Sequence, residues 1–121
     1  MRIFSFAAED GRKLEEYQSS GVRFARILRD VSTPASIGCM YLEPYGVIGR
    51  HPAHMDQLFL IVKGSGVVSG AGEKMVPVKA GRAVFWRQGE VHETRAGESG
   101  LVAIVIESVR LDPEQHMRLI A

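Results

Sequence analysis

Residues 51–66 read HPAHMDQLFLIVKGSG, and this stretch decides the fold class. Two histidines flank Pro52 and Ala53, the apolar run 58–62 follows, and Lys63 and two glycines come next. A continuous apolar run of this length, bounded by turn residues, is typical of a buried strand. We therefore predict a buried β-strand over residues 58–62 that ends in a turn at residues 63–66.

Short hydrophobic runs separated by turn residues continue on both sides of this strand. Thirteen glycines and five prolines are spread along the chain. The pattern predicts further strands at residues 22–28, 36–42, 67–69, 75–78, 83–86 and 101–106 and from His92 onward, with turns at residues 70–72, 80–81 and 87–90. About eight to ten short strands, with at most one short helix at residues 12–18, indicate an all-β sandwich or barrel.

Some positions within these strands carry finer expectations. Pro77 has no amide proton to donate, so its strand is expected at a sheet edge. In the strand at residues 36–42, Cys39 alternates with two large apolar neighbours, which predicts a buried and inert thiol. The segment 111–121 is expected to be a short tail that docks on the barrel or frays.

Length and composition narrow the class of protein. With 121 residues, 45% of them hydrophobic, the chain suits one domain, residues 1–121, with a real core. The formal net charge is +1 and both signs are mixed, so no basic stripe indicates nucleic acid. One cysteine cannot form an internal disulfide. No segment approaches the roughly 18 apolar residues of a membrane span. We expect a soluble cytoplasmic protein that binds neither nucleic acid nor membrane.

Three of the four histidines lie beside predicted turns. His51 and His54 precede the apolar run, and His92 begins another strand. Two neighbouring histidines and a distant third are a common way to bind a divalent metal, because imidazole suits Zn, Ni, Cu and Fe. A His-x-x-His pair on a turn is more often solvent-exposed or capping, so this spacing leaves both interpretations open.

The glycine and histidine spacing resembles the cupin superfamily. Its first motif is Gly, five residues, His-x-His, three or four residues, Glu, six residues, Gly; here six residues separate Gln57 from Gly64. Its second motif is Gly, five residues, Pro-x-Gly, two residues, His, three residues, Asn; here Gly81, Gly89 and His92 hold the corresponding positions. The resemblance covers about residues 36–106, and leaves residues 1–35 and 107–121 outside it.

The sequence also departs from these motifs. Gly46 is one residue too close to the first histidine, and the family's residues are replaced at the second His by Ala53, at the metal-binding Glu by Gln57, at the Pro by Arg87 and at the Asn by Ala96. The resemblance implies His51, Gln57 and His92 as metal ligands. His54 joins them if the turn at Pro52 shifts by one residue.

Membership of this superfamily implies an antiparallel double-stranded β-helix, or jelly-roll barrel, and a homodimer with contacts through N-terminal strands such as 22–28. The implied function is binding of a small organic acid or sugar derivative at a divalent ion (Zn, Ni, Mn or Fe). A catalytic version would be an isomerase, a lyase or a dioxygenase. The alternative is a non-catalytic cupin that binds a ligand without a metal.

Side chains near the expected mouth of the barrel are further candidates. Two arginines beside expected ligands could hold a carboxylate or phosphate, and two aromatic residues could line the pocket. The substrate-binding candidates are Arg50, Arg87, Phe59 and Trp86. The candidates for moving a proton in an enzyme are Glu90 and Tyr45.

Overall fold

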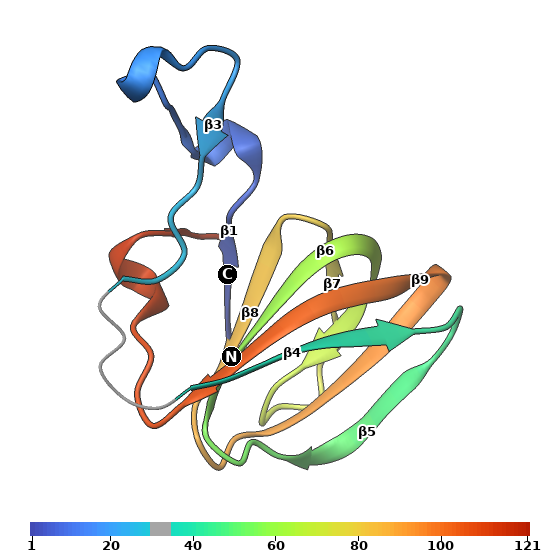
Figure 1. The fold of residues 1–121 in the computed structure, drawn as a ribbon. Coiled ribbons are helices and arrows are strands. Elements are labelled where there is room, and N and C mark those ends of the chain that lie inside the picture. Colours follow the sequence, from blue (N-terminus) through green and yellow to red (C-terminus); the bar gives the residue numbers. More distant parts are fainter. Residues whose placement is uncertain (30–34) are drawn as a thin grey trace.

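The computed structural model describes residues 1–29 and 35–121, which form mainly antiparallel strands (Figure 1). The strands are β1 (Arg2–Ser5), β2 (Arg12–Lys13), β3 (Arg23–Phe24), β4 (Ala35–Leu42), β5 (Val47–Pro52), β6 (Asp56–Ser69), β7 (Val76–Lys79), β8 (Arg82–Trp86), β9 (Val91–Ser108) and β10 (Arg118–Leu119). The helical elements among the described residues are the 3₁₀ turns η1 (Ala8–Asp10), η2 (Glu16–Gln18) and η3 (Pro113–Gln115). The predicted all-β class is confirmed.

Two long strands, β6 and β9, organise the barrel. They pair with each other from Asp56 opposite Ser108 to Ser69 opposite Glu93. On its other side, β6 pairs first with β8 and then with β7, while β9 pairs first with β5 and then with β4. The β6–β9 ribbon curves midway, so its two halves belong to two facing layers (Figure 1). One layer runs in the order β10-β1-β8-β6-β9-β4 and the other adds β7 and β5, which is a jelly-roll arrangement.

The bend of the β6–β9 ribbon depends on glycines. Gly64 has φ +84°, and a Cβ atom there would lie 2.2 Å from the carbonyl oxygen of Gly100. The register between β6 and β9 shifts on either side of this point, between Ile61 and Lys63 and again before Gly66. Bulges with glycine are the usual means of turning a strand at a barrel corner. The predicted turn at residues 63–66 is therefore wrong: the chain bends there and the strand continues to Ser69.

The apolar run is buried over residues 58–61 because β6 is covered there on both faces, whereas Val62 at its end is 47% exposed. Successive side chains of a strand point to opposite sides. Phe59 and Ile61 point into the barrel, where the core also contains Val84, Trp86, Leu101 and Ala103. Leu58 and Leu60 pack on the outside of the barrel against a second cluster that includes Phe4, Phe85, Leu111 and Met117. The C-terminal tail thus docks on the barrel, and β10 pairs with β1.

The N-terminal region differs from its prediction. The helix expected at residues 12–18 is wrong: the two-residue strand β2 and the turn η2 occupy this segment. Tyr17 and Gln18 have positive φ angles of 61° and 60°, which a right-handed helix cannot accommodate. The strand expected at 22–28 is reduced to β3, which pairs only with β2 within the described chain. The β2–β3 hairpin projects away from the barrel (Figure 1).

The strand β4 is an edge strand with exposed side chains. Its outer side carries no partner strand within the described residues, and Ile37 and Tyr41 are 68% and 78% exposed. Cys39 lies between them and is exposed as well. The expectation of a buried thiol is wrong, because nothing in the described part of the chain covers this face of β4. The predicted edge position of Pro77 is confirmed, since β7 pairs with β6 alone among the described strands.

No helix in the described part of the chain has the length and apolar character needed to cross a membrane.

Candidate functional site

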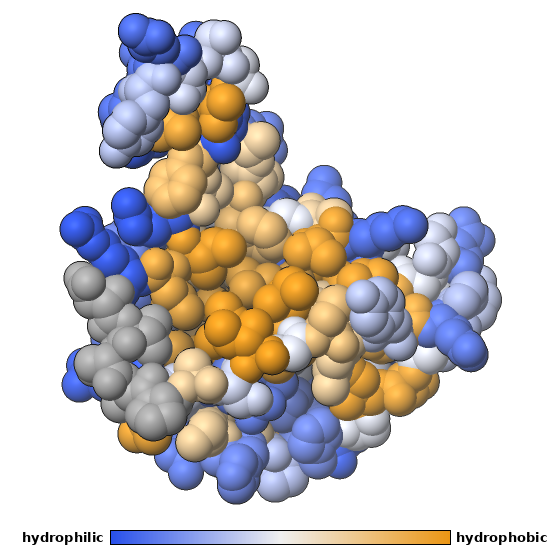
Figure 2. Space-filling view, viewed as in Figure 1, coloured by the Kyte–Doolittle hydropathy of each residue, from blue (hydrophilic) through white to orange (hydrophobic). Residues whose placement is uncertain are grey.

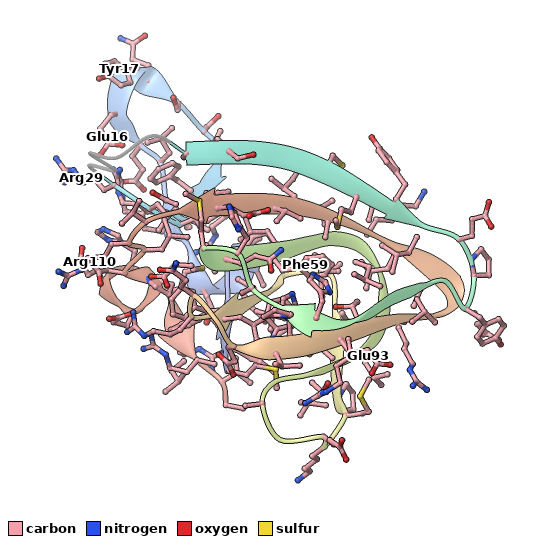
Figure 3. All side chains as sticks on the ribbon, turned by 90° about the horizontal axis from the view of Figure 1, so that it is seen from below. Glu16, Tyr17, Arg29, Phe59, Glu93 and Arg110 are labelled. Carbon is pink, nitrogen blue, oxygen red and sulfur yellow. The ribbon has the colours of Figure 1, made fainter. Side chains whose placement is uncertain are left out.

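A small cavity of about 60 Å³ lies inside the barrel between the two layers. Its lining side chains come from β4, β5, β6, β8 and β9: Met40, Ile48, His51, Gln57, Phe59, Trp86, His92 and Thr94. Strand pairing explains why they meet, because His51 lies opposite His92 and Gln57 lies opposite Trp86. Figure 3 shows Phe59 in the interior between the layers. Three of the four predicted metal ligands thus line one cavity.

The two histidines of the cavity are oriented by backbone carbonyl groups. Nδ1 of His51 lies 2.6 Å from the carbonyl oxygen of Gly49, and Nδ1 of His92 lies 3.0 Å from that of Glu90. A carbonyl oxygen only accepts, so each Nδ1 carries the proton and donates it. In its neutral form, each ring therefore keeps an unprotonated Nε2. Metal-binding histidines usually donate their other ring N–H to a carbonyl or carboxylate oxygen in this way.

The imidazole rings stand close together against an aromatic wall. The ring centroids of His51 and His92 are 4.6 Å apart, and Trp86 stacks on His92 with centroids 4.3 Å apart. Phe59 is tilted against Trp86 at 5.9 Å. The indole N–H of Trp86 donates to the carbonyl oxygen of Ser69 at 3.2 Å, which fixes the ring in its plane. The stack restricts the position of His92.

His92 is neutral at pH 7. It is 3% exposed, and burial lowers its pKa from the ordinary value of 6.5. The carbonyl oxygen of Glu90 opposes this shift, and the neighbouring charge of His51 adds to it. The carboxylates of Glu90 and Glu107 oppose it at longer range. A neutral imidazole is the protonation state that can bind a metal ion.

His54 does not line the cavity. It is exposed on the turn between β5 and β6, while Ala53 is 5% exposed and belongs to the barrel core. Backbone hydrogen bonds fix this register: the amide of Ala53 donates to Glu90 at 2.9 Å, and its carbonyl accepts from Gly89 at 2.8 Å. The shift of one residue at Pro52 that would bring His54 inward is absent from the structure.

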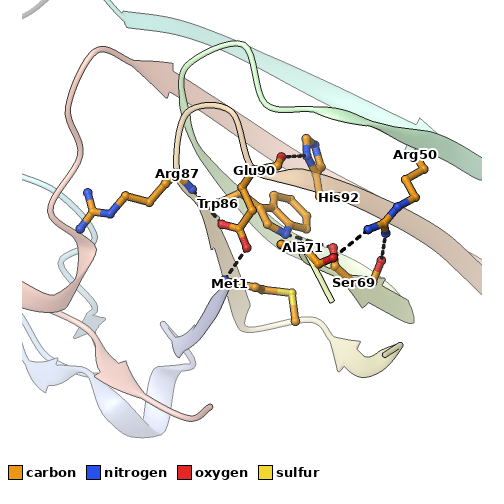
Figure 4. Close-up of polar contacts among 8 residues, drawn as sticks. All are labelled: Met1, Arg50, Ser69, Ala71, Trp86, Arg87, Glu90 and His92. Carbon is orange, nitrogen blue, oxygen red and sulfur yellow. Dashed lines mark hydrogen bonds and ion pairs between the residues drawn. The ribbon is translucent and has the colours of Figure 1, made fainter. Parts of the chain in front are cut away.

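The four candidates around the mouth also lie outside the cavity lining. Figure 4 shows the polar contacts of Arg50, Arg87 and Glu90. Arg50 donates to the Ser69 hydroxyl and to the carbonyl oxygen of Ala71. Arg87 stacks over the Phe85 ring and lies 3.7 Å from the carboxylate of Asp56. The remaining two candidates are Glu90, whose carboxylate pairs with the α-amino group of Met1 at 2.6 Å, and Tyr45, which is exposed on the turn after β4.

Three residues of the lining were not among the sequence candidates. Thr94 lies two positions after His92, so strand alternation could have placed it on the same face. Strand alternation counted from His51 does not predict the position of Ile48, because a register shift lies between these two residues of β5. Met40 carries no local signal, since its place in the lining depends on the pairing of β4 with the distant β9.

The donor set fits a metal ion without the usual carboxylate. Within residues 1–29 and 35–121, no group of three or more His, Cys, Asp or Glu side chains is placed to hold a metal. The cavity nevertheless offers two imidazole nitrogens and the Gln57 amide oxygen. Because a metal–imidazole bond is about 2.0–2.1 Å long, the 4.6 Å between ring centroids is compatible with both rings on one ion.

Comparison with known families gives a match over more than half of the chain. A family model for the cupin domain matches residues 38–107, close to the span expected from the motifs. No curated protein matches the chain.

Several solved structures share the fold. A predicted oxalate decarboxylase from Thermotoga maritima is 28% identical, with a TM-score of 0.56 over 61% of this chain and 65% of that one. KdgF from Halomonas sp. is 22% identical, with a TM-score of 0.59 over 67% and 74%. An RmlC-like cupin from Shewanella frigidimarina is 17% identical, with a TM-score of 0.57 over 63% and 67%. The matched region is just under two thirds of the Thermotoga protein.

Proposed function

The chain belongs to the cupin domain family, and from this premise we propose that its barrel binds a small organic acid or sugar derivative at a divalent metal ion. His51, Gln57 and His92 would hold the ion. The observation that carries the proposal is the pair of imidazoles whose Nδ1 protons are both donated to backbone carbonyls in one cavity. This arrangement leaves two Nε2 lone pairs available as ligands.

The charge of the donor set favours an acidic ligand. Two imidazoles and an amide are neutral, so the charge of a divalent ion stays uncompensated by the protein in a partly buried site. A carboxylate or enediolate oxygen from the ligand would supply the missing negative charge. The 28% identity to a predicted oxalate decarboxylase supports the same ligand class. When bound, the metal would act as a Lewis acid on a ligand oxygen.

The other lining residues shape the rest of the site. Phe59 and Trp86 form an apolar wall, and Thr94 contributes a hydroxyl group. The arginines at positions 50 and 87 are engaged elsewhere, so recognition of the acid falls to the metal. Glu90 and Tyr45 lie outside the lining, and the proposal gives neither of them a proton-transfer role. We therefore propose that the cavity binds its ligand, and we assign it no catalytic step.

Metal content of the untagged protein, purified without chelator, tests the proposal. We expect near-stoichiometric metal in the wild type, loss of it in His92→Ala, and retention in the matched control His54→Ala, which removes an exposed imidazole outside the cavity. Circular dichroism verifies that the variants are folded. If soaking with Zn, Ni, Mn, anaerobic Fe(II) and copper loads neither the wild type nor the control, the metal proposal fails and a metal-free ligand-binding barrel replaces it.

A homodimer is also proposed, with the second copy on the β4 face. Figure 2 shows apolar residues gathered across the face that carries β4, β6 and β9. Ile37, Tyr41 and Val62 are among the exposed apolar residues of these strands. Among the described residues no strand pairs with the outer edge of β4, and an exposed, apolar edge strand invites pairing with another chain. A two-fold axis beside β4 would pair the edge strands of two copies and bury their exposed apolar side chains at the same time.

The oligomeric state is measured by analytical ultracentrifugation. Tyr41→Lys and Ile37→Lys should convert the dimer to a monomer by placing charges in the interface. Leu119→Lys is the control, because Leu119 is 55% exposed and lies on β10 at the opposite end of the strand order. A wild type that sediments as a monomer at all concentrations contradicts the dimer.

A further inference from the structure

We infer that the cavity selects copper, and that Met40 supplies a soft thioether donor to it. The inference rests on the ligand residues of the proposed metal site, adds one ligand, and replaces the divalent ion of that proposal by a monovalent one, Cu(I). Met40 lines the same cavity as His51, Gln57 and His92. It comes from β4, whereas the other three come from β5, β6 and β9.

The side chains of β4 divide between its two faces. Ile37, Cys39 and Tyr41 share the exposed outer face, while Met40 and Leu42 share the face toward the barrel. Leu42 packs against the barrel core, and Met40, 39% exposed, lies along the cavity. The thioether of Met40 is therefore on the same side of β4 as the imidazoles.

The chemistry of the lining separates metal ions into two groups. Its donor atoms are two imidazole nitrogens, an amide oxygen, a hydroxyl and a thioether sulfur, and none of the described side chains in the lining is a carboxylate. Hard ions such as Mn²⁺ and Mg²⁺ depend on anionic oxygen ligands. Thioether sulfur is soft and selects Cu(I), and imidazole is also a ligand that suits copper. The donor set matches copper on both counts.

Charge points to the same ion. A neutral donor set leaves the full charge of the ion in the cavity, and burying charge without compensation is costly. Cu(I) brings one positive charge, whereas Zn²⁺, Mn²⁺ and Fe²⁺ bring two. Of the two carboxylates that act on His92, Glu90 is paired with the Met1 amine, and Glu107 lies outside the cavity lining. A monovalent soft ion therefore fits this cavity better than a divalent hard one.

Anaerobic competition for Cu(I) with a chromophoric chelator tests the inference. The protein is untagged and carries Cys39→Ser in every sample, because the exposed thiol of Cys39 would itself bind Cu(I). Met40→Leu keeps the volume and removes the sulfur. We expect it to weaken Cu(I) binding by about tenfold or more while changing the Zn²⁺ dissociation constant less than about twofold. Met75→Leu, outside the cavity lining, is the matched control and should bind Cu(I) as the parent does.

X-ray absorption at the copper edge gives a second readout. The parent protein should show a sulfur scatterer in addition to nitrogen, and Met40→Leu should lose it. An unchanged Cu(I) affinity in Met40→Leu, with loss of binding in His92→Ala, overturns the role of Met40 and leaves the proposed metal site intact. Mn²⁺ or Fe²⁺ binding as tight as copper overturns the selectivity. Absence of binding by every ion tested overturns both proposals.

Discussion

The indole ring of Trp86 stacks on the imidazole ring of His92, with centroids 4.3 Å apart and planes inclined by 30°. Trp86 ends β8 and His92 is the second residue of β9, so the stack spans the short turn that joins these strands. The same turn places the carbonyl oxygen of Glu90 on Nδ1 of His92. One connection thus sets both the position and the protonation of a proposed ligand.

This stack makes the single tryptophan of the chain a reporter of the cavity. Binding of Cu²⁺ or Ni²⁺ beside Trp86 should quench its fluorescence, because the ion would lie within a few ångströms of the stacked ring pair. Titration of the wild type should give a saturable loss of emission. His92→Ala should abolish the saturable phase, and His54→Ala should preserve it. Equal quenching in all three proteins would show that the ion binds elsewhere.

Gln57→Glu should tighten binding of divalent ions. The substitution replaces a neutral amide by a carboxylate of nearly the same shape at the position where the cupin motif has Glu. The added charge lies beside the proposed ion, and we expect the dissociation constant for Zn²⁺ or Mn²⁺ to fall at least about tenfold, or about 1.4 kcal/mol. Isothermal titration calorimetry measures it. Gln57→Leu, which removes the oxygen, should shift affinity in the opposite direction; a rise in both variants would contradict the role given to Gln57.

The stability of the metal-free protein should fall below pH 6.5. Burial lowers the pKa of His92 in the folded state, so the unfolded chain binds more protons between the lowered pKa and 6.5. The stabilising contribution is complete above 6.5 and is lost as the pH drops through that window. Urea unfolding in the presence of chelator, from about pH 8 to pH 5, should show this slope. His92→Gln should flatten it, and His54→Gln should leave it unchanged.

Sequence and structure agree where local patterns control the outcome. The apolar run at 58–62, the glycine spacing and the cupin motifs are enough to predict the fold, because each depends on neighbouring residues. The sequence predicts a turn at Gly64 instead of a bend, because turns and glycine bulges contain the same residue types. The exposure of His54 depends on two backbone hydrogen bonds of Ala53 with the β8–β9 turn. The presence of Met40 in the cavity depends on pairing across about sixty residues of chain, which no local pattern encodes.

Gly64→Ala should destabilise the barrel strongly. At φ +84° an L-residue is strained by about 1–2 kcal/mol, and its Cβ would also overlap the carbonyl oxygen of Gly100 at 2.2 Å. We expect a loss of more than about 2 kcal/mol in the free energy of unfolding, measured by urea denaturation. Gly72→Ala is the control, since no atom lies within 4 Å of a Cβ at that exposed position. Equal stability of the two variants would show that Gly64 is not required for the bend.

Asp56 should control both the stability of the fold and the affinity of the cavity. Its carboxylate is 5% exposed and accepts from the amides of Gln88 at 2.9 Å and Leu111 at 3.2 Å. It therefore ties the start of β6 to the β8–β9 turn and to the C-terminal tail. Asp56→Ala leaves two amide donors unsatisfied, one of them buried, which should cost about 2–4 kcal/mol.

Asp56→Asn keeps one acceptor oxygen and should lose about half as much stability. Gln57 follows Asp56 directly, and the turn fixed by Gln88 leads to His92, so loosening this contact also displaces two proposed ligands relative to each other. We therefore expect metal affinity to fall in the order wild type, Asp56→Asn, Asp56→Ala, measured with protein that is still folded at low temperature. Glu73→Ala, at an exposed carboxylate on the β6–β7 connection, should match the wild type in both respects. Reduced stability with unchanged affinity would mean that the strands position the ligands without help from Asp56.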